Sequence, residues 1–298
     1  MTAASRIPAR ALVLLVVLTV VWGTNWPLFP LATRDVSVWT FRAVAVPTAG
    51  LALLAVGKAW GLSLAVPREN WATLAWASLF NLMIWNIATA YSAILIPSGQ
   101  AAILGYTMPF WLALVGWAVL GTRPDLRMGV SIALGAAGVG LLMADAADAY
   151  AKAPLGFALG LLSGFGWALG TLVLKHRPVP VPAVVASGWM LLLAGVPIVT
   201  GALLLGSGPW FVPSWTSVAV IAYIALVPLT IGNVAWLSIV TMLPAQLAAL
   251  SSILIPIVAM ISGALVHGEP LGPLQWAAMA CSVAGLSLAL LKPAPAQR

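Results

Sequence analysis

Six amide side chains stand inside long apolar stretches of this sequence, where polar groups are rare. They are Asn25, Asn81, Asn86, Gln100, Asn233 and Gln246. In hydrocarbon such a side chain is costly, so it tends to face a cavity or a neighbouring helix. In a cavity, an amide both donates and accepts hydrogen bonds and would hold a small zwitterionic or neutral molecule. The alternative is a hydrogen bond between helices, which contributes modestly to packing.

The 15 tryptophans form two groups. Some stand near the ends of apolar stretches, which is typical of an interfacial belt: Trp60, Trp71, Trp210 and Trp215. Others stand within the stretches: Trp22, Trp26, Trp85, Trp111, Trp117, Trp167, Trp189 and Trp236. A tryptophan that lines a pathway can stack on a ring or a cation, whereas packing against lipid or helices is the alternative. For a cavity wall we favour Trp22 and Trp167, followed by Trp189, Tyr91 and Tyr106.

Three prolines predict interruptions in otherwise helical stretches, namely Pro27, Pro109 and Pro256. A proline inside a helix leaves the carbonyl four residues earlier without its usual donor. The carbonyls concerned belong to Gly23, Gly105 and Ser252. Such groups can accept a substrate ammonium, and broken helix ends favour a carboxylate. The prolines can equally act as hinges or simple kinks.

Arg42 is the single basic residue clearly within an apolar stretch. Three roles are open to it. Its side chain can extend to the membrane surface, pair with Asp35, or bind a substrate carboxylate. Phosphorylated substrates are disfavoured, because they would need several buried Lys or Arg residues.

Acidic residues are missing from the middle of every apolar stretch. Proton-coupled pumps usually place a titratable group in the pathway. We therefore expect facilitated diffusion or exchange without a built-in proton carrier. His267 and Glu269 are the two residues that could still support proton coupling. The sequence also lacks nucleotide-binding loops, metal-ligand spacings and Ser/His/Asp constellations. No metal, cofactor or enzymatic activity is expected.

The composition explains why these polar residues are exceptional. The chain has 298 residues, of which 62% are hydrophobic and 6% charged, with a mean hydropathy of +1.08. A soluble domain carries about 25% charged residues, so this chain could not cover a water-facing surface. A polytopic membrane protein is predicted, and soluble enzymes, nucleic-acid binders and disulfide-bonded secreted scaffolds are disfavoured. The single cysteine, Cys281, cannot form an internal disulfide.

Proline, glycine and charge clusters divide the chain into ten apolar segments, each predicted to be a transmembrane helix. They cover residues 10–32, 37–56, 69–93, 97–120, 126–143, 154–174, 182–205, 215–240, 244–267 and 271–291. If both termini are cytoplasmic, 10 of the 13 Lys and Arg residues lie inside, 2 lie outside and Arg42 lies in a helix. This asymmetry follows the positive-inside rule.

The two halves of the chain repeat. Pro97 and Pro109 recur 147 positions later as Pro244 and Pro256. At the same offset recur the pairs Asn86 and Asn233, Gly116 and Gly263, Gly121 and Gly268, and Gly138 and Gly285. We predict a first repeat at 1–147 and a second at 148–298. Because each repeat has an odd number of helices, five, the second must be inverted, an architecture of secondary transporters.

Two motifs complete the pattern: Val21-Trp22-Gly23-Thr24-Asn25-Trp26, and the paired prolines followed by Gly268-Glu269. In their order and spacing they resemble EamA-type members of the drug/metabolite transporter superfamily, over essentially the whole chain. Such families commonly have Glu after the loop glycine in both halves, but the first half here has Thr122. The resemblance implies export of small metabolites, with aromatic amino acid exporters as a branch that matches the tryptophan-rich interior.

Taken together, these features predict an all-α integral membrane protein of the cell inner membrane that exports amino acids or similar small molecules by alternating access. The alternatives are a channel-like pore, an exporter of other metabolites or drugs, and a membrane scaffold or receptor. The expected partners are a small-molecule substrate and the lipid bilayer, with no nucleic acid. A monomer and a homodimer are both compatible with the sequence.

Overall fold

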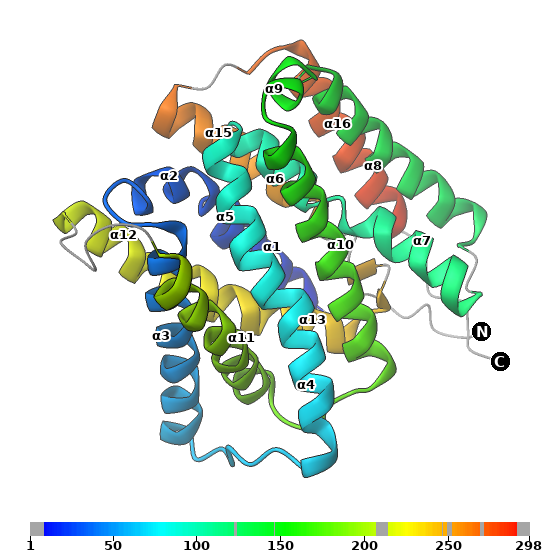
Figure 1. The fold of residues 1–298 in the computed structure, drawn as a ribbon. Coiled ribbons are helices and arrows are strands. Elements are labelled where there is room, and N and C mark those ends of the chain that lie inside the picture. The colour runs from blue at the N-terminus through cyan, green and yellow to red at the C-terminus, as the bar shows by residue number, and fades with distance from the viewer. Residues whose placement is uncertain are drawn as a thin grey trace, which may run out of the picture.

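A computed structural model describes residues 9–121, 124–145, 147–206, 214–245, 247–248, 252–268 and 271–290. Within these residues every regular element is a helix (Figure 1). Each of the ten predicted spans contains one or more of these helices, so the all-helical prediction is confirmed. Backbone groups in hydrocarbon must be paired within their own segment, which helices achieve for long apolar runs.

The first five spans correspond to the following elements. They are α1 (Ala9–Gly23), η1 (Trp26–Leu28) and α2 (Phe29–Ala32); α3 (Val38–Ala59); η2 (Arg68–Asn70), α4 (Trp71–Ser78), η3 (Leu79–Ile84) and α5 (Trp85–Leu95); α6 (Ser98–Gly105) and α7 (Met108–Leu120); and α8 (Leu126–Asp145). The short helix α9 (Ala147–Lys152) follows.

The last five spans follow the same plan. They are α10 (Pro154–His176); α11 (Ala183–Leu205); α12 (Trp215–Leu226), η4 (Pro228–Gly232) and α13 (Asn233–Met242); η5 (Ser252–Leu254) and α15 (Ile255–His267); and α16 (Pro273–Leu290). In the described part of the chain, seven helical segments are long and apolar enough to cross a membrane, and the helices at Leu126–Leu141 and Ile255–His267 are apolar but shorter.

Equivalent positions of the two halves end helices in the same way. Gly121 ends α7 and Gly268 ends α15, both in the left-handed conformation with φ of 66° and 68°. Glycine adopts this conformation without the steric cost that a Cβ would add. Ser37 and Ser214 cap helices that are not equivalent, α3 and α12, and each accepts a hydrogen bond from the backbone N–H three residues later.

Two helices contain a π-helical turn that the sequence did not predict. The turn η3 separates α4 from α5, and η4 separates α12 from α13. Both lie in the third span of their half. A π turn widens a helix locally, occurs mostly as a single turn, and is frequent at functional sites.

Helices from opposite halves pack closely through small residues. The most extensive contacts join α3 to α11 and α8 to α16. At Gly50, a Cβ would lie 3.0 Å from the Gly188 carbonyl oxygen, and at Gly195 it would lie 2.9 Å from the Pro47 ring. Backbones approach this closely only where side chains are absent. The first half is therefore held against the second along most of α3.

The helix α10 packs by a ridge of glycines against the first half. Cβ atoms at Gly156, Gly160 and Gly164 would come within 2.9, 2.7 and 2.6 Å of side-chain atoms of Leu95, Leu104 and Thr107 in the first half. These glycines, spaced four apart, are a small-residue stripe whose packing role the sequence predicts, and the close approach confirms it.

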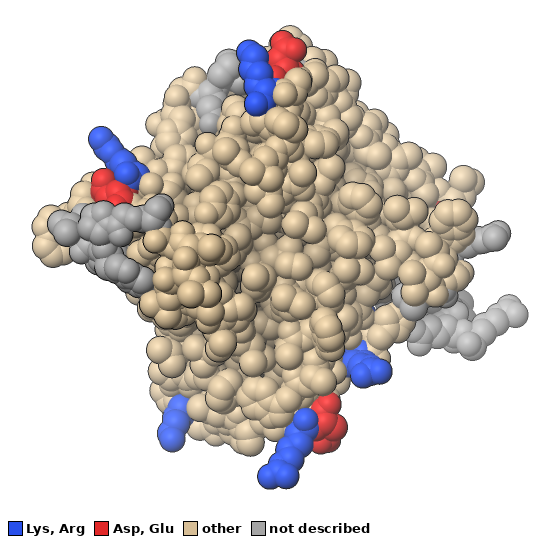
Figure 2. All heavy atoms as spheres, in the orientation of Figure 1, with Lys and Arg blue, Asp and Glu red and all other residues tan. Residues whose placement is uncertain are grey.

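Charged side chains gather at the ends of the helices. Figure 2 shows Lys, Arg, Asp and Glu at the rims of this face, with a broad uncharged area between them. Lys58 lies in the last turn of α3, for example, while Arg34 and Asp35 precede its start. An uncharged band between charged rims is what a membrane-embedded surface requires.

Candidate functional site

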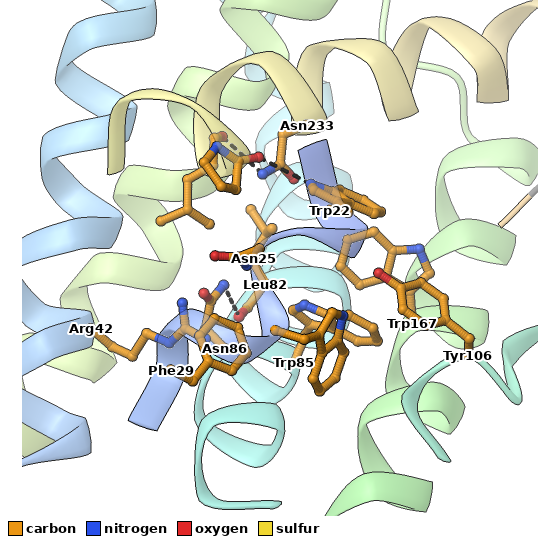
Figure 3. Close-up of a pocket in the computed structure, with 13 residues that line it drawn as sticks. Trp22, Asn25, Phe29, Arg42, Leu82, Trp85, Asn86, Tyr106, Trp167 and Asn233 are labelled. Atoms are coloured by element: carbon orange, nitrogen blue, oxygen red, sulfur yellow. Dashed lines mark hydrogen bonds between the residues drawn. The ribbon is translucent and has the colours of Figure 1, made fainter. Parts of the chain in front are cut away.

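A small cavity lies at the centre of the helices, and residues from both halves line it (Figure 3). We call it the central cavity. It is lined by Trp22, Asn25, Trp26, Phe29, Arg42, Leu82, Trp85, Asn86, Tyr106, Trp167, Pro228, Leu229 and Asn233. Its free volume is about 20 Å³, and a water molecule needs about 10–15 Å³ on this measure. In this state the cavity holds no more than water.

Aromatic rings form one wall of the central cavity. The Trp167 ring lies 4.6 Å from Trp85 and 5.2 Å from Trp22, measured between centroids, in edge-to-face arrangements. The Tyr106 ring completes this wall, 5.6 Å from Trp85 and 5.9 Å from Trp26. Such geometry is favoured by the quadrupoles of the rings. The wall presents both π faces and ring edges to a ligand.

Trp22 also connects the halves by a hydrogen bond. Its indole Nε1 donates to the carbonyl oxygen of Pro228, at the start of η4, over 3.0 Å. A Cβ at Gly232 would lie 2.0 Å from the same nitrogen. Trp22 therefore fits against the π turn because position 232 is glycine.

Asn86 and Asn233 line the cavity in equivalent ways. Asn86 Nδ2 donates to the Leu82 carbonyl over 2.8 Å, and Asn233 Nδ2 donates to the Leu229 carbonyl over 2.9 Å. Both acceptor carbonyls belong to π turns. The Asn86 Oδ1 atom is buried and has no hydrogen-bond partner in the structure. One end of the amide is thus fixed to the backbone while its oxygen is available.

Asn25 and Asn81 differ in position. Asn25 lines the central cavity, and its Oδ1 atom is buried without a hydrogen-bond partner. Asn81 lines a neighbouring cavity of about 10 Å³ and donates from Nδ2 to the Trp167 carbonyl over 2.9 Å. A Cβ at Gly170 would lie 2.5 Å from the Asn81 amide. Asn81 therefore positions α10, the helix that carries Trp167.

Arg42 is buried in the central cavity, although it stands only four residues after the start of α3. Its side chain is 1% exposed, and its guanidinium carbon lies 4.5 Å from the centre of the Phe29 ring and 4.4 Å from that of Phe41. It does not extend to the surface, and it does not pair with Asp35. Of the three roles that the sequence left open, the geometry retains the binding of a carboxylate.

Asp35 instead joins the segment before α3 to the start of α12. Its carboxylate accepts hydrogen bonds from Ser214 Oγ at 2.5 Å, Ser217 Oγ at 2.7 Å and the Ser214 backbone N–H at 3.2 Å. The Ser214 hydroxyl, followed by that of Ser217, lowers the pKa of the Asp35 carboxyl below its ordinary value. We call these three residues the Asp35 latch.

Other sequence-predicted residues lie away from the cavity. Trp189 donates from Nε1 to the Leu64 carbonyl over 2.9 Å and packs against Trp71. Tyr91 is half-buried on α5 and does not line the central cavity. Gln246 lies outside the described residues, as do Thr122 and Glu269.

The three prolines stand at the starts of helical segments. Pro27 lies in η1, and Pro109 and Pro256 lie in the first turns of α7 and α15. The first turn tolerates proline because its N–H groups have no intrahelical partner. The Gly23 carbonyl, expected to be bare, accepts a hydrogen bond from Ser262 Oγ over 3.3 Å.

The Gly105 carbonyl, likewise expected to be bare, lies against α10, where a Cβ at Gly164 would come within 2.8 Å of its oxygen. Neither of these two carbonyls points to a ligand role.

A larger opening of about 600 Å³, which we call the vestibule, lies between the ends of α1, α10, α11 and α13. Arg10 and Lys175 are its basic residues, and Leu237 is part of its wall. Leu237 also lines the neighbouring cavity of Asn81, which in turn shares Leu82, Trp167 and Asn233 with the central cavity. A continuous series of side chains thus separates the vestibule from the centre.

The sequence indicated Arg42 only as one of several possible ligand-binding residues, and it did not identify Phe29 or the two π turns as parts of the site. The signal for Arg42 was its isolation as the one basic residue within an apolar stretch. The π turns leave no motif, because their residues are as apolar as the helices around them.

The model of the EamA-like transporter family matches residues 9–144 and 154–291. The uncharacterized transporter YvbV of Bacillus subtilis is 24% identical over 275 residues, covering 88% of this chain and 85% of the relative. The uncharacterized inner membrane transporter YedA of Escherichia coli is 25% identical over 278 residues, covering 92% and 88%.

A probable amino-acid metabolite efflux pump of Escherichia coli is 27% identical over 201 residues, covering 64% of this chain and 66% of the pump. A solved structure with a TM-score of 0.73 and 20% identity covers 96% of this chain and 98% of its own. That likeness shows a shared fold.

Proposed function

Because this chain belongs to the EamA-like transporter family, we propose that it is a secondary carrier that exports small zwitterionic or neutral metabolites across the inner membrane. Amino acids, including aromatic ones, are the proposed substrates. The observation that carries the proposal is the central cavity, where aromatic rings, amides and one buried cation converge from both halves. The efflux pump among the relatives supports amino-acid metabolites as the substrate class.

The chemistry of the cavity fits a molecule with an aromatic group and both charges. The wall of Trp22, Trp85 and Trp167 offers ring edges and faces for an aromatic side chain. The free amide oxygens of Asn25 and Asn86 can accept hydrogen bonds from an ammonium group. Ligand sites typically combine such apolar walls with a few placed polar groups.

We propose that transport follows alternating access between two inverted halves, residues 1–147 and 148–298. With both termini in the cytoplasm, the vestibule faces the cytoplasm and the Asp35 latch faces the outside. The structure then corresponds to a state closed to the outside by the latch and partly open to the inside. The inner barrier is formed by Leu237 and the tryptophans beside it.

The central cavity is too small for the proposed substrates in this structure, so substrate binding must enlarge it. A free volume of about 20 Å³ means that rings must separate before a metabolite enters. The breaks before Pro27, Pro109 and Pro256 lie in helices that contribute to or flank the cavity. These breaks are suited to absorbing the necessary backbone changes.

We propose that the carrier has no built-in proton coupling. No Asp or Glu lines the central cavity in the described part of the chain. His267, a titratable residue that the sequence left open for coupling, makes a hydrogen bond from Nε2 to the Pro27 carbonyl over 2.7 Å, which engages one ring nitrogen. Flux should therefore follow the substrate gradient alone.

The test is a substrate panel in proteoliposomes, measured as counterflow. A carrier accelerates uptake of labelled L-phenylalanine when unlabelled substrate is preloaded, and its flux saturates. Unsaturable flux without counterflow would support a channel-like pore instead. Flux that accelerates strongly with an imposed pH gradient, after correction for substrate charge, would contradict the absence of proton coupling.

A further inference from the structure

We propose that Arg42 is the carboxylate anchor of the central cavity, and that the amide oxygens of Asn25 and Asn86 receive the ammonium group of the same substrate. The transported molecule is then an α-amino acid with both charges intact. This inference rests on the proposed function and names the groups that select its substrate.

The burial and isolation of the Arg42 guanidinium carry the argument. The side chain is 1% exposed, and its Nε atom is buried with no hydrogen-bond partner. No carboxylate lines the central cavity with it in the described residues. The nearest acidic residue along the chain, Asp35, is engaged by Ser214 and Ser217. Arg42 is thus a buried cation without a counter-ion.

An unpaired buried charge is costly, and proteins almost always pair it or bind it to a ligand. The Phe29 and Phe41 rings beside the guanidinium stabilise a cation through their faces. Rings cannot supply the hydrogen-bond acceptors that a guanidinium fork requires. A ligand carboxylate, which matches that fork with two parallel hydrogen bonds, supplies both the charge and the acceptors.

The arrangement around Arg42 places an ammonium acceptor nearby. Figure 3 shows Arg42 reaching from α3 toward Asn86 and Phe29, with Asn25 above them. The Oδ1 atoms of Asn25 and Asn86 are buried without partners, and each accepts hydrogen bonds only. Cation, acceptors and aromatic wall thus surround one small space. They match the carboxylate, ammonium and side chain of an aromatic amino acid.

One cation also sets the charge that the cavity accepts. A single guanidinium balances one carboxylate, and the remaining ammonium of a zwitterion is held by the amide oxygens and ring faces of the cavity, which suit a cation. A phosphate ester carries more negative charge and would remain unbalanced. The cavity therefore discriminates in favour of zwitterions and monocarboxylates.

The experiment compares Arg42→Gln and Arg42→Lys with the wild type in proteoliposomes. Arg34→Gln, which removes an exposed arginine near the same helix end, is the matched control. Each protein is assayed with L-phenylalanine and with L-phenylalaninamide, which lacks the carboxylate. Arg42→Gln removes a buried charge, so its unfolding temperature without ligand should equal or exceed that of the wild type.

We expect Arg42→Gln to lower phenylalanine flux at least tenfold while phenylalaninamide flux stays within about twofold of the wild type. The phenylalanine flux of Arg42→Lys should lie between those of Arg42→Gln and the wild type, since an ammonium keeps the charge but lacks the planar fork. Arg34→Gln should transport both compounds as the wild type does. Unchanged phenylalanine flux in Arg42→Gln would overturn the proposal. Equal loss of both fluxes would also overturn it, because that result indicates a structural role.

A binding measurement separates this inference from the proposed function. The unfolding temperature of the purified protein is recorded with L-phenylalanine and 3-phenylpropionate, each against its amide. The anchor predicts stabilisation by both carboxylates in the wild type and not in Arg42→Gln. If the wild type binds them but transports neither, the proposed function fails and the anchor stands. If neither carboxylate stabilises the wild type, the anchor is wrong.

Discussion

Asn86 and Asn233 stand 147 positions apart and make the same hydrogen bond, each donating from Nδ2 to the carbonyl four residues earlier, within a π turn. Each amide thereby ties the first residues of the following helix to the widened turn. The pair belongs to different halves of the chain, yet both residues line one cavity. This geometric equivalence is what two halves with interchangeable roles in transport require.

Replacement of either asparagine by alanine should lower transport by similar factors. The lost hydrogen bond contributes about 1 kcal/mol, which corresponds to about a fivefold change in an equilibrium. We expect a three- to tenfold loss of phenylalanine counterflow at unchanged expression, because net hydrogen-bond contributions scatter around that value by about 0.5 kcal/mol. Asn70→Ala, at the start of α4 without a side-chain cap bond, is the control. Normal flux in both cavity variants would show that these amides only support the fold.

Trp22→Phe should weaken the contact between α1 and η4 while keeping an aromatic ring. The variant loses the hydrogen bond from Nε1 to the Pro228 carbonyl, so the unfolding free energy should fall by about 1 kcal/mol. Trp117→Phe, at a ring that is 53% exposed, should have no such effect. Denaturant titration followed by tryptophan fluorescence measures both variants. Equal stability of Trp22→Phe and the wild type would mean that the bond contributes nothing net.

Opening of the Asp35 latch should depend on pH only in strong acid. The pKa of Asp35 is lowered below 3.8 by its hydrogen bonds, so the ionised form stabilises the closed latch. That contribution is complete above the ordinary pKa and is lost as the pH falls through the lowered one. Quenching of the cavity tryptophans by acrylamide should therefore be constant from pH 8 to about 5 and rise below about 4.

Asp35→Ala should reproduce the acid state at pH 7, because it removes the acceptor for Ser214 and Ser217. Its quenching constant should exceed that of the wild type. Asp148→Ala, at an exposed acidic residue of α9, is the matched control. Identical quenching in Asp35→Ala and the control would remove the latch from the mechanism.

Gly160→Ala should destabilise the protein, whereas Gly140→Ala should not. A Cβ at Gly160 would lie 2.7 Å from Leu104 Cβ, while a Cβ at Gly140 meets nothing within 4 Å. Overpacking of this kind costs about 1–3 kcal/mol, and alanine in an open helical position gains about 0.5–1 kcal/mol over glycine. Unfolding temperatures of the two purified variants should move in opposite directions. If the unfolding temperatures of both variants moved in the same direction, the α10–α6 interface would not be tightly packed at Gly160.

The inverted arrangement of the halves predicts opposite sides for two equivalent loops. Cysteines introduced singly at Asp125 and Leu271, in a Cys281→Ser background, should be labelled from opposite sides of the membrane. Cys281 is the only cysteine in the sequence, so this one substitution removes all labelling except that of the introduced cysteine. Intact cells and inverted vesicles treated with an impermeant maleimide report the side. Labelling of both positions from one side would contradict the inverted topology.

The sequence by itself determined the class and the course of the chain. Apolar runs too long and too free of charge for a soluble protein require helices in a membrane, since each helix satisfies its backbone internally. The offset of 147 residues between paired prolines, asparagines and glycines was visible without coordinates. Gly121 and Gly268 then proved to end equivalent helices in the same left-handed conformation.

Only the tertiary structure decided which polar residues meet. Regular helical periodicity cannot follow side chains across a π turn, because the added residue rotates everything beyond it. Trp189 and Trp22 stand in similar apolar sequence, yet one bonds to a loop carbonyl and the other to the π turn beside the cavity. Arg42 had three possible environments in sequence. Its place between Phe29 and Phe41 follows from the contact of the Phe29 ring on α2 with the Phe41 ring on α3, which no local pattern encodes.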